Sequence, residues 1–323
     1  MQNLRLKLRL VGLLAAVALG LAGPLGCGAS GSCDTFADDY CARLSECDPV
    51  IYAALSGGDA AICRARFAPL CTRSVAIEGV KFTADGAGQC GKGVRAASCD
   101  DLLGGNLPAV CTPPGSRADG ASCSDSLQCA STRCTGSATT CGTCVPRLKS
   151  GEACQSSGQC QYGLYCKLAG TGPGACTPYV QVGQSCAAGD QCLPTLFCNT
   201  GGQPSGTCAA RRAAGEACSR NADCDNQKSL VCDSASKQCV AYTVNYIEVG
   251  ASCANSGSTT SFNICRRDAH CVTTTTTGGG STSTCVAALA AGQSCNNLDS
   301  ECAAGLTCTS QVCQSSPVPQ SCL

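Results

Sequence analysis

The residues with the clearest chemical potential are the 35 cysteines, of which Cys141 and Cys144 form the single Cys-x-x-Cys motif. Such a pair can carry out thiol–disulfide exchange, because the motif lowers the pKa of a thiol. The βαβ pattern that accompanies redox motifs of this kind is missing around it. Cys144-Val-Pro also aligns with Cys176-Thr-Pro further along the chain. We therefore expect Cys144 to be structural and Cys141 to be an extra cysteine, matched in number by Cys322.

The residue types and their spacing argue against a metal site and against a catalytic site. Zinc sites need thiolates in pairs two to four residues apart, whereas the prevailing gap between cysteines here is five residues. His270 is the sole histidine, and we expect it in a surface loop. No cysteine is expected to be free to act as the nucleophile that a catalytic histidine would activate. The sequence predicts no catalytic, metal or cofactor-binding residue, no cofactor and no enzymatic activity.

The first 26 residues read as a secretory signal peptide. Three basic residues (Arg5, Lys7 and Arg9) precede a 13-residue apolar run, Leu10 to Ala22, which is shorter than the ~20 residues of a membrane-spanning helix. Cys27 follows Pro24-Leu25-Gly26, a segment that resembles a bacterial lipobox, in which the cysteine is lipidated. Pro24 and Leu25 depart from the usual pattern, and ordinary cleavage after Ala22 is the alternative.

Cysteine parity favours lipidation of Cys27. An odd cysteine in an exported protein needs a separate role, and assigning Cys27 to lipid leaves 34 cysteines for 17 bridges. Residues 27–32 would then form a short flexible tether. We expect an outer-membrane or cell-surface lipoprotein, or otherwise a periplasmic or secreted protein, in an oxidising compartment.

The composition indicates a fold held by disulfides. Cysteine makes up 35 of 323 residues, above the level typical of disulfide scaffolds. After residue 26 only 43 residues are Leu, Ile, Val or Phe, roughly 14% of the remainder and too few for one large core. The same segment holds 19 basic and 22 acidic residues. A net charge of −3 without a basic stripe argues against nucleic-acid binding.

Residues 33–111 contain eight irregularly spaced cysteines and a helical apolar pattern. Phe36, Tyr40 and Leu44 recur at four-residue intervals, so we expect a helix that Ser32 caps and that Asp48-Pro49 ends. A second helix is expected from Asp59, with Pro69 bending or ending it. A third, weakened by four glycines, is expected over Thr83–Ala97. These helices predict a small disulfide-stapled domain, followed by a linker at 112–119.

Residues 120–313 hold six cysteine-rich repeats. A Gly-x-x-Cys phrase recurs near 120, 151, 183, 215, 250 and 292, and its cysteines are 31, 32, 32, 35 and 42 residues apart, which is a repeat period. We expect short β-hairpins with little other regular structure, in an elongated array. Repeat five carries the low-complexity segment Thr273–Gly280, which we leave without assigned structure. Residues 314–323 form a tail.

Four cysteines per repeat allow three pairings. We favour first to third and second to fourth, because adjacent pairing would leave two independent small loops, whereas crossed bridges tie the whole repeat together. Each bridge closes a loop of ~12–17 residues and contributes roughly 3 kcal/mol in the chain-entropy account. The favoured pairs are Cys154–Cys166, Cys160–Cys176, Cys186–Cys198, Cys192–Cys208, Cys218–Cys232, Cys224–Cys239, Cys253–Cys271, Cys265–Cys285, Cys295–Cys308 and Cys302–Cys313.

A leucine recurs two residues before the third cysteine in four of the repeats (Leu164, Leu196, Leu230 and Leu306). Neighbours in an extended segment point to opposite sides, so we expect these leucines in the repeat core. The following residues would then form a variable outer face; they are Arg133, Tyr165, Phe197, Val231, His270 and Thr307.

The aromatic residues of the array raise the question of a contact surface. Residues 240–249 alternate like a strand and include Tyr242 and Tyr246. Exposed tyrosines are typical contact residues, although covering a disulfide is the commoner role.

The repeats resemble the cysteine-rich modules of bacterial lipoproteins that are similar to the Dickkopf N-terminal cysteine-rich domain. The resemblance covers about 117–313 and is based on Gly-x-x-Cys, the five-residue cysteine gap and contexts such as Gly163-Leu164-Tyr165-Cys166. It implies a scaffold rather than an activity, and transfers no ligand-contact residue.

The sequence therefore predicts a non-enzymatic, secreted or envelope-anchored protein with a recognition or structural role. The expected partner is an envelope or extracellular protein or glycan, with membrane contact through the lipid alone. An inhibitor or antagonist of a protease or receptor is one alternative, and an envelope thiol–disulfide oxidoreductase using Cys141 and Cys144 is another.

Overall fold

The structure is a computed structural model that describes residues 27–136, 140–168, 172–187, 192–201, 203–255, 260–266, 268–275, 281–296, 301–315 and 322. The predicted signal peptide lies outside these residues. A helical region comes first, and short strand pairs follow, both cross-linked by disulfides. The predicted fold class is thereby confirmed. Within the described ranges, no helix has the length and apolar character needed to cross a membrane.

Polar caps set the helix boundaries. Asp48 caps α3 by accepting from the backbone N–H of Ile51, Asp59 caps α4, Thr83 caps α5 and Ser98 caps α6. The helices are α2 (Cys27–Cys47), α3 (Pro49–Ser56), α4 (Ala60–Ala76), α5 (Ala84–Ala96) and α6 (Cys99–Gly104). The short 3-10 turns are η2 (Ala109–Cys111), η3 (Ser126–Gln128), η4 (Ser157–Gln159), η6 (Asn221–Asp223) and η7 (Asn226–Lys228).

Two expectations for the start of this region were wrong. Helix α2 begins at Cys27, so the predicted tether over 27–32 is helical and Ser32 lies inside the helix. Pro69 lies within α4 and does not end it, since the helix continues to Ala76. The segment 112–119, predicted as a linker, has no helix or strand but is hydrogen-bonded: the backbone N–H of Gly115 donates to the carbonyl of Cys129 and that of Ser116 to the carbonyl of Gly79. Hydrogen bonds to neighbouring segments thus order a stretch whose composition alone indicates a loop.

Disulfides join α2 to α4 and α6, and α5 to the turn η2. Bridges Cys33–Cys71 and Cys41–Cys63 tie α2 to α4, Cys47–Cys99 ties α2 to α6, and Cys90–Cys111 ties α5 to η2. Phe82, Val94 and Leu102 are buried with three of these bridges in one cluster, and the Cys41–Cys63 bridge is buried in a second cluster with Phe67. Gly91 faces α2 so closely that a Cβ there would lie 2.9 Å from the Cα of Phe36. This glycine therefore permits close packing of α5 on α2 rather than only weakening its helix.

The repeats contain antiparallel strand pairs and, in repeats two and three, three-stranded sheets. The sheet orders are β1–β2, β3–β5–β4, β6–β8–β7, β10–β9, β13–β14 and β15–β16, together with the parallel pair β11–β12. The strands are β1 (Ser122–Cys123), β2 (Gly142–Thr143), β3 (Ala153–Cys154), β4 (Leu164–Lys167), β5 (Gly174–Pro178), β6 (Ser185–Cys186), β7 (Leu196–Asn199), β8 (Gly206–Ala210), β9 (Leu230–Cys232), β10 (Cys239–Ala241), β11 (Thr243–Ile247), β12 (Ser261–Cys265), β13 (Ala269–Thr275), β14 (Ser281–Ala287), β15 (Leu306–Thr309) and β16 (Val312–Ser315).

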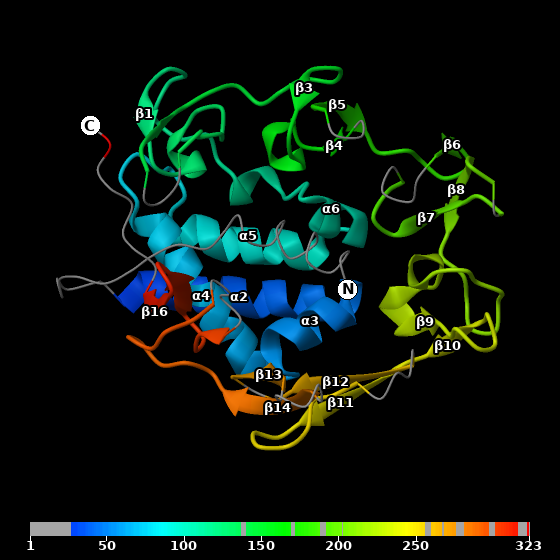
Figure 1. Cartoon of the computed structure of the whole chain (residues 1–323). Helices are drawn as coiled ribbons and strands as arrows, with labels where there is room; N and C mark the ends of the chain where they lie inside the picture. Colours follow the sequence, from blue (N-terminus) through cyan, green and yellow to red (C-terminus); the bar gives the residue numbers. More distant parts are fainter. Residues whose placement is uncertain are drawn as a thin grey trace.

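The repeats curve around the helical region instead of extending away from it, which corrects the expected elongated array (Figure 1). Repeat one contacts the α4–α5 loop through Gln128 Nε2, which donates to the carbonyl of Glu78 at 2.8 Å. Repeat three contacts α6, where the backbone N–H of Thr195 donates to Asp100 at 2.7 Å. Repeat five contacts α4 through the Arg66–Asp268 ion pair at 3.0 Å. These polar contacts are between distant residues, so local sequence patterns do not reveal them.

Candidate functional site

The recurring Gly-x-x-Cys phrase forms a turn that hydrogen-bonds to the fourth cysteine of its own repeat. In repeat two the backbone N–H of Gly151 donates to the carbonyl of Cys176 at 2.8 Å, and the N–H of Cys176 returns a bond to Glu152 at 2.9 Å. Gly151 has a φ of 87°, in the left-handed region that favours glycine. The corresponding glycines of the other five repeats have φ between 79° and 89°. The phrase is thus a structural requirement of the module.

In every repeat the first cysteine is bonded to the third and the second to the fourth. The structure contains the ten pairs favoured above for repeats two to six, Cys154–Cys166 through Cys302–Cys313. Repeat one follows the same rule with Cys123–Cys134 and Cys129–Cys144. In repeat two the sulfurs of Cys154, Cys160 and Cys176 lie within 4.8 Å of one another. All three are disulfide sulfurs, so they present no thiolate to a metal ion.

A second recurring device is an acceptor side chain immediately before the second cysteine. Gln128, Gln159, Asp223 and Glu301 each accept from backbone N–H groups just after the first cysteine, at 2.6–2.8 Å for their shortest bonds. The side chain thus closes the loop between the first two cysteines. The sequence analysis missed this position, although aligning the repeats on their second cysteines would have indicated it.

The Cys141–Cys322 bridge closes the ring of repeats. Cys141 in repeat one is bonded to Cys322 in the tail, 181 residues away. The Arg117 guanidinium, before repeat one, donates to the carbonyl of Cys322 at 2.9 Å. Cys144 is bonded instead to Cys129. The two cysteines of the Cys-x-x-Cys motif therefore belong to different bridges, which is not the paired state that the oxidoreductase alternative requires.

Three of the six residues expected on the outer face are buried. Tyr165, Phe197 and Val231 are each 5% exposed or less. The recurrent leucines nevertheless pack against the bridge cysteines of their own repeats, as expected, with Leu230 buried and Leu164 and Leu196 partly buried. The Tyr165 ring lies 5.0 Å from that of Tyr179. A Cβ on Gly104 of α6 would lie 3.9 Å from Tyr179. In repeat two the residue after the leucine thus packs on Tyr179, which lies next to α6.

The other aromatic side chains of the array offer little free contact surface. Tyr242 is buried, and its ring lies 5.3 Å from that of Phe262. Tyr162 is 40% exposed, but the Arg147 guanidinium lies 4.2 Å above its ring. The tyrosine contact role, which the sequence offers only as the less common alternative, therefore stays a hypothesis.

His270 lies on strand β13, opposite Val286, not in the expected surface loop. Burial lowers its pKa, and Glu301 and Asp268 oppose this shift. Both carboxylates already have structural partners: Asp268 accepts from Arg66 and from the backbone N–H of Ala304, and Glu301 accepts from Asn296. We therefore interpret this cluster as the junction between α4, repeat five and repeat six.

The buried Arg73 of α4 and the half-buried Asp125 of repeat one interact electrostatically. Burial lowers the pKa of Arg73 to about 10, while Asp125 acts in the opposite direction. Burial likewise raises the pKa of Asp125, opposed by the backbone N–H of Leu127 and then by Arg73. Asp125 caps η3, so this pair too has a structural use.

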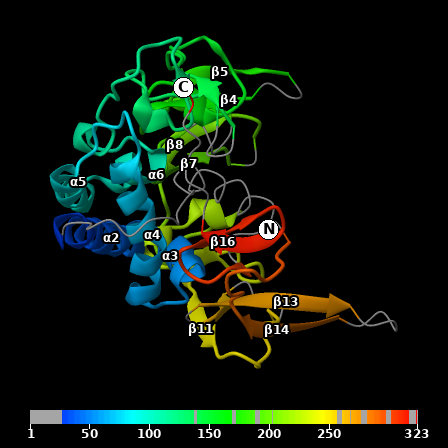
Figure 2. The ribbon, with the colours of Figure 1, turned by 90° about the vertical axis from the view of Figure 1, so that its left-hand side faces the viewer.

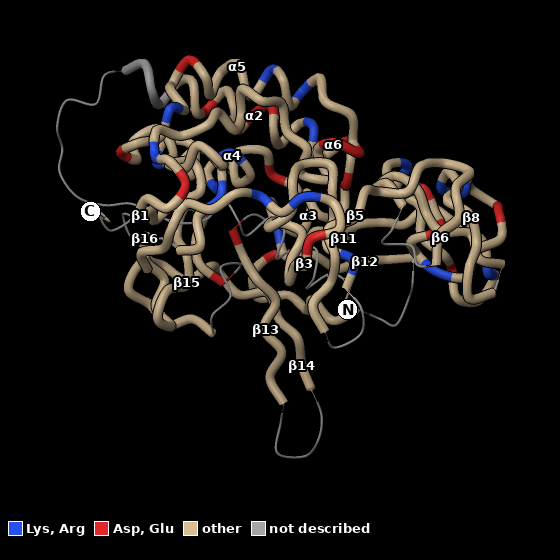
Figure 3. Tube along the Cα trace, turned by 90° about the horizontal axis from the view of Figure 1, so that it is seen from above, with Lys and Arg blue, Asp and Glu red and all other residues tan. Residues whose placement is uncertain are grey.

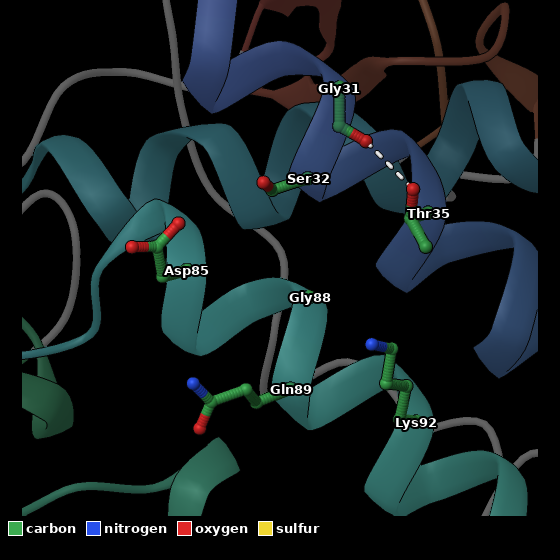
Figure 4. Close-up of a pocket in the computed structure, with 7 residues that line it drawn as sticks. All are labelled: Gly31, Ser32, Thr35, Asp85, Gly88, Gln89 and Lys92. Atoms are coloured by element: carbon green, nitrogen blue, oxygen red, sulfur yellow. Dashed lines mark hydrogen bonds between the residues drawn. The ribbon is translucent and has the colours of Figure 1, made fainter.

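An open depression of about 530 Å³ between α2 and α5 is the best candidate for a ligand contact surface. Ser32 and Thr35 line it from α2, and Asp85, Gln89 and Lys92 line it from α5 (Figure 4). Gly31 and Gly88 add no side chain, and a Cβ at either would meet nothing within 4 Å. The lining combines hydroxyl, amide, carboxylate and ammonium groups, so it suits a polar partner.

A second depression, of about 340 Å³, lies where repeat five meets the α3–α4 turn. Gly58, Asp59, Tyr246 and Arg266 line it. Asp59 caps α4 and Arg266 pairs with Glu248 at 3.2 Å. These side chains are thus already paired, which makes this depression the weaker candidate.

The predicted lipidation residue is at the start of helix α2. Cys27 is the first residue of that helix, and the structure describes its backbone alone. All 34 cysteines from Cys33 to Cys322 are in the 17 bridges. Bonding on this scale is consistent with an extracellular or exported protein.

Comparison with known proteins does not assign this chain to a family. No family model, curated protein or solved structure matches the chain. The resemblance to Dickkopf-like modules stays a prediction from cysteine spacing.

Proposed function

We propose that this protein is a non-enzymatic recognition protein of the cell envelope, anchored through lipid on Cys27. The observation that carries the proposal is the covalent ring, in which Cys141–Cys322 joins the first repeat to the tail around the helical region. A framework cross-linked in this way keeps its surface in one conformation, so a partner binds without first ordering the protein. A persistent, preorganised surface is what recognition outside the cell requires.

The use of the cysteines supports the anchor. Seventeen bridges account for the cysteines from 33 to 322, and Cys27 is the remaining one of the 35. A single acyl chain gives only marginal membrane binding, so we infer that more than one chain is attached, as stable anchoring requires. The partner would meet the protein close to the membrane, since the α2–α5 depression begins four residues after Cys27.

The depression is the surface that we propose for recognition of an envelope glycan or a polar protein segment. Asp85, Gln89 and Lys92 lie on one face of α5 and are all exposed. Their spacing of three to four residues places them side by side along the helix. They offer both hydrogen-bond donors and acceptors to a polar partner.

The anchor is tested by replacing Cys27 with serine and following the exported protein between membrane and soluble fractions. The wild-type chain should be membrane-bound, with an acylated Cys27 at its N-terminus, and Cys27→Ser should be soluble. Ser30→Ala, three residues further on, is the matched control and should stay membrane-bound. A wild-type protein that starts at Gly23 without acyl groups would overturn the anchor.

Recognition is tested with the soluble Cys27→Ser protein and isolated envelopes of the producing cell. Exchanging Asp85→Asn and Lys92→Gln together should weaken binding at least several-fold without changing net charge. The control is Asp119→Asn with Lys149→Gln, which removes the same two charges from exposed positions outside the depression. Equal binding by both double variants would refute the depression as the contact surface.

A further inference from the structure

Repeat five carries a hairpin that is longer than its counterparts in the other repeats. Strands β13 and β14 have seven residues each. The equivalent strands β4, β7 and β15 have four residues, and β9 has three. The shorter hairpins hold their disulfides equally well, so the extra length is not needed to build the module.

The extension consists of residues with hydroxyl side chains. Thr273, Thr274 and Thr275 pair with Ser283, Thr282 and Ser281 of the opposite strand. Thr273, Thr274, Thr275, Ser281 and Thr282 are exposed. Two cross-strand hydroxyl contacts, Thr273–Ser283 at 2.8 Å and Thr274–Thr282 at 3.0 Å, hold the ladder together. Each hydroxyl keeps acceptor lone pairs beyond these contacts.

The hairpin projects from the body and carries no formal charge along its length. Figures 2 and 3 show β13 and β14 extending away from the rest of the ring, and Figure 3 shows no acidic or basic position on these two strands. The sequence from 269 to 287 indeed contains no Lys, Arg, Asp or Glu. An enzyme could therefore approach these hydroxyls without displacing other parts of the protein.

The hydroxyls lie on both faces of the hairpin. Side chains alternate along a strand, so the pairs Thr273/Ser283 and Thr275/Ser281 share one face, and Thr274/Thr282 lie on the other. The bridge sulfurs Cys271 and Cys285 lie nearer the base of the hairpin. A docking face would concentrate its contacts on one side, whereas acceptors for a covalent modification can surround the hairpin.

We propose that Thr273–Thr275 and Ser281–Ser283 are an O-glycosylation site. The substrate class is a sugar activated by a nucleotide or polyprenyl phosphate, used by a transferase of the producing cell. A threonine or serine Oγ attacks the anomeric carbon, and the new C–O bond replaces the bond to phosphate. The phosphate leaves with the bonding electron pair, and the hydroxyl proton passes to a base of the transferase. Glycans there would cover a hairpin of a type that is marginally stable alone.

The test is peptide mapping of the protein purified from its producing organism. After reduction and alkylation, cleavage after Asp268 and Asp299 releases residues 269–299. This peptide should carry sugar masses that alkaline β-elimination removes and that fragmentation assigns to the six hydroxyls. Replacing Thr273, Thr274 and Thr275 with valine, and Ser281, Thr282 and Ser283 with alanine, should abolish them. Thr309→Val, in the corresponding strand β15, should leave them unchanged.

A peptide found only at its unmodified mass would overturn the proposal, as would sugars confined to other residues. An unmodified protein that dimerises through the β13 edge would overturn it in favour of strand pairing between two copies. The wild-type peptide decides the question even if the multiple variant does not fold. The outcome is also independent of acylation at Cys27, so it can fail while the proposed anchor holds.

Discussion

The backbone N–H of Gly151 donates to the carbonyl of Cys176 at 2.8 Å, from a conformation with a φ of 87°. The same relationship recurs in the other five repeats between the phrase glycine and the fourth cysteine. It links the start of each module to its last bridge. The Gly-x-x-Cys phrase recurs because the turn requires it.

Gly151→Ala should destabilise the protein by about 1–2 kcal/mol, because a Cβ disfavours the left-handed conformation. A Cβ at this position would meet nothing within 4 Å, so the effect is one of backbone conformation and not of packing. The free energy of unfolding in denaturant measures it.

Gly88→Ala is the matched control for this substitution. Gly88 lies inside α5, where a Cβ also meets nothing within 4 Å. Alanine should stabilise this helix by about 0.5–1 kcal/mol. If both substitutions shifted stability in the same direction, the conformational explanation would be wrong.

Gln128→Ala should cost about 1–3 kcal/mol, because it leaves buried backbone groups without partners. The Gln128 side chain is 3% exposed, accepts from the N–H of Ser124 at 2.8 Å and donates to the carbonyl of Glu78 at 2.8 Å. Gln159→Ala removes the equivalent bond to Gln155 from a less buried position. It should cost less, so equal losses of Tm would contradict an interdomain role for Gln128.

Replacing Cys141 and Cys322 with serine should release the tail and repeat six while the other bridges persist. The closed loop spans 181 residues, for which chain entropy gives an upper limit of about 5 kcal/mol; the other bridges shorten the effective loop and reduce this value. The expected result is faster proteolytic cleavage in the C-terminal region and a larger hydrodynamic radius. Cys154→Ser with Cys166→Ser should instead expose repeat two to cleavage. A double variant lacking Cys141 and Cys322 that kept wild-type compactness and resistance would show that the ring does not depend on its closing bridge.

Glu46 should make stability depend on pH. Hydrogen bonds from Arg95 at 2.5 Å and Arg43 at 2.8 Å lower the pKa of this carboxyl. A depressed pKa in the folded state gives stability that is present above the ordinary Glu value of about 4.3 and is lost as pH falls through the folded value.

Glu46→Gln should therefore lower Tm at neutral pH. Below the ordinary Glu pKa, the Tm of this variant should fall less steeply with decreasing pH than the Tm of the wild-type protein. Arg95→Gln should produce much of the same change, and the double variant should be less than additive because the two residues interact. The pH profile of Tm for the four proteins measures this. Independent, additive effects would argue against the ion pair.

The sequence predicted those parts of the structure that depend on local chemistry. Asp59 and Thr83 could be placed next to helix starts because capping acts within one turn. The crossed bridges could be favoured because adjacent pairing of the four cysteines would leave two independent small loops in each module. Helices α3 and α6, with eight and six residues, are too short for a clear apolar period and were missed.

Contacts between distant segments could not be predicted in this way. The alternation of side chains at Leu164 and Tyr165 indicates that the strand has two faces, but it does not indicate which face lies towards α6. The Arg66–Asp268 pair joins residues 202 positions apart, so no local pattern contains it. For the same reason the sequence did not predict the α2–α5 depression. It forms between two helices that disulfides hold to their neighbours.

The central claim is that disulfides with one defined pairing hold this chain in its shape, and mass spectrometry of the unreduced, exported protein tests it most directly. We expect no free thiol from Cys33 to Cys322, crossed bridges within each repeat and a linked peptide containing Cys141 and Cys322. A compactly folded protein with several free thiols, or with Cys141 bonded to Cys144, would contradict the account.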